Sequence, residues 1–282
     1  MMHNRWYWLI KGLFFSEAAK GNRWKVLGKF VLAHVRFFFH KSFITNWVRG
    51  IRLYVIQHRA SSTSCYYFGK YDWSEMCFLE KYLRNTDVFA DIGSNIGSYA
   101  LFAASCGARV IAVEPCPSAL RILKKNIMLN PSLKDRISCK GTAVGETDGE
   151  VYFTTGNDTT NRIVKNAQDG KGEDAVKVQC RRLDSIIRQC SVIKMDVENY
   201  EIPALKGSRK LLENEKCNAV IIEAFEEAAQ IKEILGSHGF YPYTYDVERN
   251  RLAKHNGPQK GNNLIFIKDI RKARKRLKGE RI

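Results

Sequence analysis

The stretch DIGSNIG, residues 91–97, places an aspartate and two glycines between an apolar run and a helical pattern. A phosphate-binding Walker loop would need Gly-Lys-Ser/Thr at the start of that helix, and no such sequence follows Gly97. A dinucleotide fingerprint would need glycine where Asn95 stands, because the pyrophosphate approaches the backbone there. The carboxylate of Asp91 would also repel a pyrophosphate and attract a positive charge. The loop therefore favours S-adenosylmethionine, a nucleoside with an ammonium, a sulfonium and a carboxylate that the helix N-terminus can bind.

A second acidic residue, Glu114, ends the next apolar run, VIAVE, 23 residues after Asp91. An acid at the end of the second strand of such a fold can accept hydrogen bonds from both ribose hydroxyls. NAD-binding enzymes share this feature, so Glu114 alone does not distinguish the two ligands. A tight strand-to-helix turn without a ligand is the alternative for the glycines, but it leaves the combination of acid, loop and acid unexplained.

A group of carboxylates follows the later apolar run SVIKM. Asp196 and Glu198 are two residues apart and would share one face of a straight strand, and Glu223 ends the neighbouring run VIIE. Converging carboxylates are costly unless they are protonated, paired or bound to a metal. We interpret Asp196, Glu198 and Glu223 as catalytic and metal-free, with a general base that takes the proton of an alcohol. Mg²⁺ or Ca²⁺ is the alternative, because oxygen ligands without histidine do not favour zinc.

Structural roles compete with catalysis at several of these positions. Asp196 could hold the amino end of the cofactor, and for Glu201 we expect pairing with Lys194 or Arg209 rather than catalysis. Two histidines in predicted loops, His238 and His255, are alternative bases.

Alternating strand and helix patterns from residue 87 onward should position these residues. Strands are predicted at 87–93, 108–115, 137–145, 191–198 and 218–225, and helices at 95–106, 118–130, 202–214 and 227–239. Further β segments are predicted at 150–155, 175–180, 240–248 and 262–269, with a short helix at 183–189. The pattern predicts an α/β, Rossmann-like fold: a mostly parallel twisted sheet, covered on both faces, with an antiparallel edge hairpin. In such folds ligands lie at the carboxyl ends of the strands.

The net charge of +17 is concentrated at the two ends of the chain. Residues 1–60 hold 11 Lys/Arg against one acid, and residues 268–282 hold 8 against 2, so the remainder is nearly neutral. This distribution predicts docking onto an anionic partner rather than an active site for anions. The eight cysteines are scattered without a CxxC pair, which is typical of reduced thiols in a cytosolic protein.

The N-terminal region interleaves Trp and Phe with Arg and Lys, as in KFVLAHVRFFFHKSFITNW. No run reaches the roughly 18–20 uncharged apolar residues of a membrane span, and Lys11 interrupts a stretch that imitates a signal peptide. Residues 1–60 therefore suit helices on an anionic bilayer or an acidic partner, at the cytoplasmic face of the membrane. The alternative is that the aromatic residues pack these helices against the main domain, and both can hold.

The motifs DIGSNIG, VIAVEP, KKNIMLN, TAVG, RLDS and IKMDVENYEIPALKGS, in this order, resemble those of FkbM-type methyltransferases. The resemblance covers roughly residues 68–240, and its late motif, Lys194-x-Asp196-x-Glu198-x-x-Glu201, is distinctive of that family. It implies a class I, S-adenosylmethionine-dependent fold and methylation of hydroxyls on sugars, glycolipids or natural products. Asn199 stands where the family usually has glycine, and asparagine tolerates a positive φ better than most residues; Ser94 likewise replaces a common alanine.

Seven residues match the family's cofactor contacts. Asp91, Gly93, Asn95 and Gly97 would contact the methionine part, Glu114 the ribose, and Thr142 and Ala143, at the end of the third strand, would lie beside the adenine.

Together these observations predict three regions: a basic, aromatic, helical extension at 1–60, a methyltransferase domain at 61–269 and a basic tail at 270–282. The predicted activity is O-methylation of a hydroxyl, which we expect to belong to a saccharide in a surface glycan, a glycolipid or a natural product. A nucleic-acid methyltransferase is an alternative, but KMDVENYE replaces the Asn/Asp-Pro-Pro-aromatic loop that methylation of base amino groups uses. A non-catalytic scaffold with the same fold is the other alternative.

Overall fold

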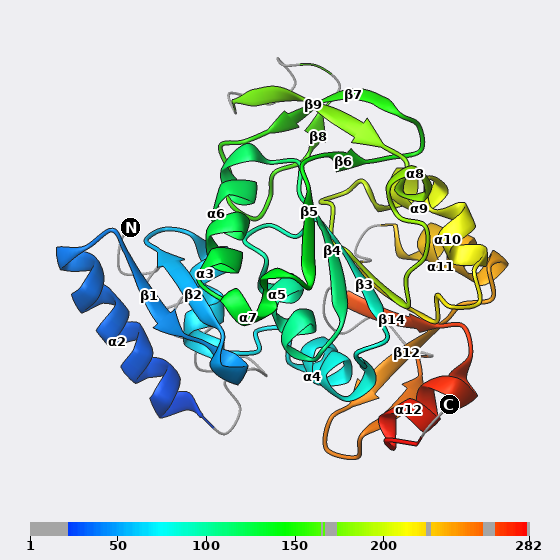
Figure 1. Cartoon of the computed structure of the whole chain (residues 1–282), viewed down its shortest axis with the longest axis horizontal. Coiled ribbons are helices and arrows are strands. Elements are labelled where there is room, and N and C mark those ends of the chain that lie inside the picture. Colours follow the sequence, from blue (N-terminus) through cyan, green and yellow to red (C-terminus); the bar gives the residue numbers. More distant parts are fainter. Residues whose placement is uncertain (1–21, 165, 167–173, 224–226, 256–262, 281–282) are drawn as a thin grey trace.

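The computed structural model of the chain describes residues 22–280, apart from 165, 167–173, 224–226 and 256–262. Its centre is a sheet of five parallel strands, extended at one edge by three antiparallel strands (Figure 1). In spatial order the strands are β13 (Arg251–Lys254), β12 (Tyr241–Asp246), β14 (Asn263–Ile267), β11 (Ala219–Glu223), β10 (Val192–Met195), β3 (Val88–Ile92), β4 (Arg109–Val113) and β5 (Ile137–Lys140). This order confirms the predicted Rossmann-like α/β fold, although the antiparallel edge holds one strand, β13, that the sequence analysis does not predict.

The central parallel strands β3, β10 and β11 are buried on both faces, as expected for a sheet between two helical layers. Along β11, Ile221 belongs to one core cluster and Ile222 to the other, because neighbouring side chains of a strand point to opposite faces. Helices α4 (Trp73–Tyr82), α5 (Ser98–Ser105), α6 (Pro117–Met128), α7 (Pro131–Lys134) and α12 (Ile270–Leu277) pack on the first cluster. Helices α8 (Leu183–Ile186), α9 (Glu201–Lys206), α10 (Arg209–Glu213) and α11 (Ala228–Ser237) pack on the second.

A second, four-stranded sheet lies above the ends of β4 and β5 in Figure 1. Its strands, in spatial order, are β6 (Ala143–Val144), β9 (Ala175–Arg181), β7 (Gly149–Thr154) and β8 (Ile163–Val164). The predicted third strand, 137–145, is therefore wrong in its extent: β5 ends at Lys140, and β6 pairs with β9 instead. The hydroxyl of Thr142 donates to the carbonyl oxygen of Gln179 at 2.8 Å, which holds the chain on this second sheet.

The described part of the N-terminal region contains a helix, as predicted, and a β hairpin, which was not predicted. Helix α2 (Arg23–Phe39) is followed by β1 (Ser42–Asn46), the 3₁₀ turn η2 (Val48–Gly50), β2 (Arg52–Ile56) and α3 (Ala60–Phe68). Leu53 and Val55 of β2 are fully buried in the core cluster of the main sheet. The N–H of Tyr54 donates to the side-chain oxygen of Asn126 on α6 at 2.9 Å, where in a wider sheet it would bond to a neighbouring strand. The hairpin therefore shares the hydrophobic core of the main sheet.

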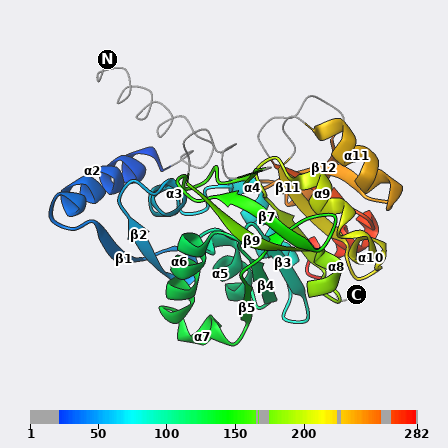
Figure 2. The same ribbon diagram turned by 90° about the horizontal axis from the view of Figure 1, so that it is seen from above.

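The described parts of the two basic ends of the chain are far apart. Residues 270–277, predicted only as part of a basic tail, form α12, whose Arg276 is buried against Asp87 and the Tyr82 ring. Figures 1 and 2 place α2 and α12 at opposite ends of the molecule, so their charges do not make one continuous patch. Among the described helices, none combines the length and apolar character needed to cross a bilayer.

Candidate active site

Residues 91–97 connect β3 to α5 through three left-handed backbone positions. Gly93, Asn95 and Gly97 have φ angles of 80°, 46° and 84°, a region that glycine and asparagine tolerate. A Cβ atom on Gly93 would lie 1.8 Å from the backbone oxygen of Asp196. The loop therefore packs directly against the segment that carries the catalytic candidates.

Asp91 is buried beneath this loop, near the end of β3. Its Oδ2 has no hydrogen-bond partner in the described part of the chain, and burial raises the pKa of the carboxyl to about 7 although the Lys194 ammonium opposes the shift. A buried polar oxygen without a partner is costly. Asp91 also borders a cavity of about 360 Å³, so a cationic group bound there would remove that cost. The ammonium of S-adenosylmethionine fits this environment.

Glu114 follows β4 and lies on the same cavity. Its Oε2 accepts the N–H of Asn95 at 2.7 Å, and its Oε1 accepts the N–H of Cys116 at 2.8 Å. Burial raises the pKa of this carboxyl to about 7 as well. A carboxylate has about four acceptor positions, so Glu114 can accept these two backbone N–H groups and still accept hydrogen bonds from ribose hydroxyls.

Thr142 and Ala143 line the cavity from the second sheet rather than from the end of a central strand. Phe153 of β7 and Ile163 of β8 line it too, and the sequence analysis did not predict them as site residues. These side chains form an apolar wall of the kind that receives a planar ring.

Asp158 is a further site residue that sequence reasoning missed. Its carboxylate accepts the N–H and the hydroxyl of Ser61, each at 2.9 Å, and lies 3.2 Å from the Nε of Arg59. Its backbone oxygen accepts the side-chain amide of Asn95 at 3.1 Å. The polar segment TTGNDTTN between two predicted β segments was the available signal, because a polar loop between strands commonly carries functional residues.

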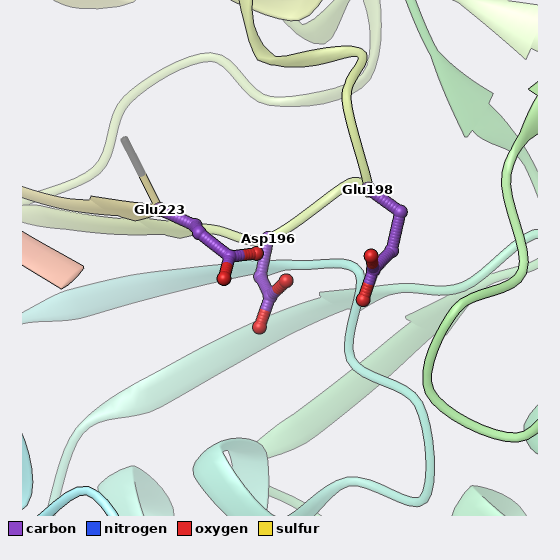
Figure 3. A group of neighbouring side chains, drawn as sticks. All are labelled: Asp196, Glu198 and Glu223. Atoms are coloured by element: carbon purple, nitrogen blue, oxygen red, sulfur yellow. The ribbon is translucent and has the colours of Figure 1, made fainter. Parts of the chain in front are cut away.

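The catalytic candidates Asp196, Glu198 and Glu223 come together as predicted, but by a different geometry. β10 ends at Met195, and Glu198 has a left-handed φ of 51°. The expectation that Asp196 and Glu198 share one face of a straight strand is therefore wrong, because the chain turns between them. The three carboxylates nevertheless point to one side (Figure 3), each with an oxygen within 4.8 Å of the others.

Charge and burial make these carboxylates unequal. Asp196 Oδ2 accepts a hydrogen bond from the fully buried Lys194 ammonium at 3.1 Å. Within the described part of the chain Glu198 accepts no such hydrogen bond from a cation. Burial together with the charge of Asp196 raises its pKa to about 8, although the Lys194 ammonium opposes the shift. Burial and Asp196 also raise the pKa of Glu223. Glu198 is thus the candidate best suited to hold a proton near neutral pH.

Glu201 has the structural role that we expected, but with another partner. Its Oε1 accepts the N–H of Val197 at 3.1 Å at the start of α9. Lys194 pairs with Asp196, and Arg209 pairs with Glu213 at 2.8 Å. Glu201 therefore stabilises the turn after β10.

The two histidines considered as alternative bases differ in position. His238 follows α11 and is not among the described residues that line the cavity beside Asp91 or the larger groove described next. His255 follows β13 and lines that larger groove.

A larger groove of about 1830 Å³ adjoins the smaller cavity. Asp196 and Glu198 line both spaces, whereas Glu223 lines only the groove. Three aromatic residues, Tyr67, Trp73 and Tyr243, are among those that border the groove. The carboxylates therefore stand where the two spaces meet.

The sequence of this region also matches a known domain. Residues 91–242, just over half of the chain, match the model of the methyltransferase FkbM domain. The chain belongs to the FkbM methyltransferase family. The resemblance seen in the sequence is thereby confirmed.

Two individual proteins illustrate the distance to known members. The chain is 24% identical over 220 residues to the methyltransferase sdnD of Sordaria araneosa, which covers 64% of this chain and 81% of that protein. It is 22% identical to the solved methyltransferase FkbM from Methylobacillus flagellatus, with a TM-score of 0.47, over 66% of this chain and 44% of that one. This chain thus spans less than half the length of that solved FkbM protein.

Membership of the FkbM family makes the turn after β10 informative. Asn199 stands where glycine is usual, and its φ of 66° lies in the left-handed region. Together with Glu198 it forms the turn that brings the carboxylate back toward Asp196. The asparagine is therefore compatible with the left-handed turn at this position.

The same three carboxylates could ligate a divalent cation through oxygen atoms. Because the Lys194 ammonium already occupies one side of Asp196, we keep the metal-free interpretation as a prediction.

Proposed function

We propose that this protein is an S-adenosylmethionine-dependent O-methyltransferase whose acceptor is a saccharide hydroxyl in a surface glycan, a glycolipid or a natural product. The observation that carries the proposal is the position of Asp196 and Glu198 on both the smaller cavity and the groove. A methyl donor in one space and an acceptor in the other would meet beside these carboxylates. Methyl transfer requires such a meeting point, because the acceptor oxygen must lie in line behind the methyl group.

The residues around the smaller cavity suit each part of S-adenosylmethionine, which supplies an electrophilic methyl group on its sulfonium sulfur when bound. Asp91 would bind the amino group through its unpartnered Oδ2, and Glu114 would accept the ribose hydroxyls. Phe153 and Ile163 would enclose the adenine, next to Thr142. The N-terminus of α5 would attract the carboxylate of the methionine part.

Glu198 is the proposed general base. An alcohol becomes a competent nucleophile as its proton leaves, so the hydroxyl proton would pass to the Glu198 carboxylate while the oxygen bonds to the methyl carbon. The sulfur–methyl bond would break in the same step, with its electron pair left on a neutral thioether sulfur. A raised pKa makes Glu198 a stronger base than an exposed glutamate. The positive sulfonium nearby would favour the ionised carboxylate before transfer. Asp196, held by Lys194, would help to orient the acceptor beside Glu198.

The composition of the groove supports a saccharide as the acceptor. Tyr67, Trp73 and Tyr243 offer aromatic rings, while carboxylates and hydroxyls at the groove offer hydrogen-bond acceptors and donors. A ligand site that combines apolar walls with a few placed polar groups suits a ring with one apolar face and several hydroxyls. The groove is also large enough for more than one such ring.

The direct test uses the full-length protein and S-adenosylmethionine that is labelled in its methyl group. It is incubated with a panel of free saccharides, lipid-linked saccharides, RNA and peptide extracts. We expect label in a saccharide fraction, as a methyl ether that survives the alkaline treatment that cleaves methyl esters. Label in RNA instead, or absence of binding heat when S-adenosylmethionine is titrated into the protein, would overturn the proposal.

A further inference from the structure

Helix α2 has two apolar sides that face in opposite directions. Successive residues of an α-helix are about 100° apart around its axis, so one side carries Val26, Phe30, Ala33 and Phe37, all buried. The other side carries Val31, Val35 and Phe38, which are 55%, 52% and 84% exposed. The first side accounts for the packing of α2 on the protein, whereas the second side packs in no hydrophobic cluster of the part of the chain that the structure describes.

The exposed side of α2 is a patch rather than a set of scattered residues. Large hydrophobic side chains are clearly exposed at ten positions in the described part of the chain, and six of them lie on α2. They are Trp24, Val31, Leu32, Val35, Phe38 and Phe39. Single exposed hydrophobic residues are ordinary, but a contiguous exposed apolar face indicates an interaction site.

The charges next to this patch have one sign. Lys25, Lys29 and Arg36 lie along one flank of α2, and Lys41 follows the helix. The sequence contains no acidic residue between Glu17 and Asp72. An apolar helix face bordered by cations, without acids, is the pattern of helices that lie in the headgroup region of anionic bilayers. A nucleic acid would use the cations alone and leave the aliphatic and aromatic side chains exposed to water.

We propose that the exposed face of α2 docks on an anionic lipid bilayer, with Val31, Val35 and Phe38 in the headgroup region and the exposed Lys25 and Lys41 against lipid phosphates. Lys25, Val26 and Lys29 also line the groove that reaches Asp196 and Glu198. A lipid-linked saccharide in that bilayer would therefore meet the groove at α2. This second step rests on the proposed function, whereas the docking itself does not.

Vesicle binding by the full-length protein tests the docking. Phosphatidylcholine vesicles with and without phosphatidylglycerol are compared by flotation, at low and high salt. We expect binding to the anionic vesicles, weakened by salt because screening reduces attraction between charges. The double variant Phe38→Ser/Phe39→Ser should lose at least about tenfold in partitioning, because two large apolar side chains no longer enter the interface. Lys25→Gln should lose about fivefold on anionic vesicles only.

Met128→Ser is the matched control, because Met128 is 74% exposed on α6, away from the patch. Its vesicle binding should equal that of the wild type, and all variants should retain S-adenosylmethionine binding. Undiminished vesicle binding by Phe38→Ser/Phe39→Ser would overturn the docking. So would a dimer that this double variant abolishes, or binding to RNA without binding to vesicles.

The outcomes also separate the docking from the proposed function. Vesicle binding without methyl transfer to any saccharide would defeat the function and leave the docking intact. Methyl transfer to a free saccharide without vesicle binding would defeat the docking alone.

Discussion

The Oε2 of Glu114 accepts the N–H of Asn95 at 2.7 Å, and thereby links the end of β4 to the left-handed position of the loop after β3. The residue that the sequence predicts as a ribose ligand therefore also fixes the loop predicted to hold the methionine part. One side chain therefore supports two parts of the same predicted cofactor site. Removal of its charge should affect both.

Glu114→Ala should weaken S-adenosylmethionine binding by roughly 100-fold, because hydrogen bonds to a charged acceptor contribute about 1.5–3 kcal/mol each. Glu114→Gln should have a smaller effect, because the amide oxygen can still accept one of the two backbone N–H groups. Isothermal titration calorimetry measures both. Glu146→Ala, at an exposed position, is the control, and an affinity of Glu114→Ala equal to that of the control would rule out the assignment.

Glu198→Gln should lower turnover by roughly 100- to 10,000-fold, the usual contribution of a positioned general base. The affinity for S-adenosylmethionine should remain within about threefold, because the proposed ligands of its ammonium and ribose are Asp91 and Glu114 rather than Glu198. Single-turnover methyl transfer with a saccharide acceptor gives the rate. Glu213→Gln removes an acid that pairs with Arg209 at the surface and should change neither quantity. Normal turnover in Glu198→Gln would exclude a catalytic role.

The affinity for S-adenosylmethionine should rise with pH because of Asp91. The pKa of its carboxyl in the ligand-free protein is about 7, so the ionised form that attracts an ammonium becomes dominant above neutral pH. Between about pH 6 and pH 8 the ionised fraction, and with it the affinity, should rise roughly tenfold. Asp91→Asn should bind weakly at every pH. A wild-type affinity that is independent of pH would contradict this role.

Asp91 should also make folding stability depend on pH in the opposite direction. A folded-state pKa above the unfolded value contributes stability that is present at low pH and lost as pH rises toward about 7. Asp91→Asn should therefore raise the free energy of unfolding at about pH 8 by a few kcal/mol, while it abolishes tight cofactor binding. Urea denaturation at two pH values measures the difference, with Asp148→Asn at an exposed site as the control.

Chelation should leave methyl transfer unchanged. Lys194 donates to Asp196 at 3.1 Å, so a cation already partly neutralises the group Asp196, Glu198 and Glu223. The test is methyl transfer after dialysis against EDTA, followed by addition of Mg²⁺ or Ca²⁺. Loss of activity that Mg²⁺ or Ca²⁺ restores would establish the oxygen-ligand alternative instead.

The loop and the carboxylates could be predicted from the sequence because each is marked by a pattern of neighbouring residues. Asp91, Glu114 and Asp196 each come at or just after the end of an apolar run, and the carboxyl ends of neighbouring parallel strands meet at one edge of a sheet. The prediction of a straight strand through Glu198 was wrong, but the predicted position of its carboxylate did not depend on it. A turn and a straight strand both bring this carboxylate to the end of β10.

Features that depend on distant contacts were not predicted. The β1–β2 hairpin docks through Asn126 and Asn130, whose side chains accept the N–H groups of Tyr54 and Arg52. The sequence around Arg52 and Tyr54 does not indicate these partners, which lie more than 70 residues away along the chain. The wall of the cavity depends similarly on the pairing of Ala143 with Cys180 between β6 and β9. Register between segments that are far apart in sequence is set by the folded core and the turns.

Gly93→Ala should destabilise the fold and abolish cofactor binding together. Gly93 has a φ of 80°, and an added Cβ would lie 1.8 Å from the backbone oxygen of Asp196. Backbone strain and a clash that no side-chain rotation relieves should cost at least about 2–4 kcal/mol of folding free energy. Gly149→Ala is the control, because nothing lies within 4 Å of its added Cβ. Thermal unfolding and titration with S-adenosylmethionine measure the two effects. Wild-type stability in Gly93→Ala would mean that the loop does not pack against Asp196.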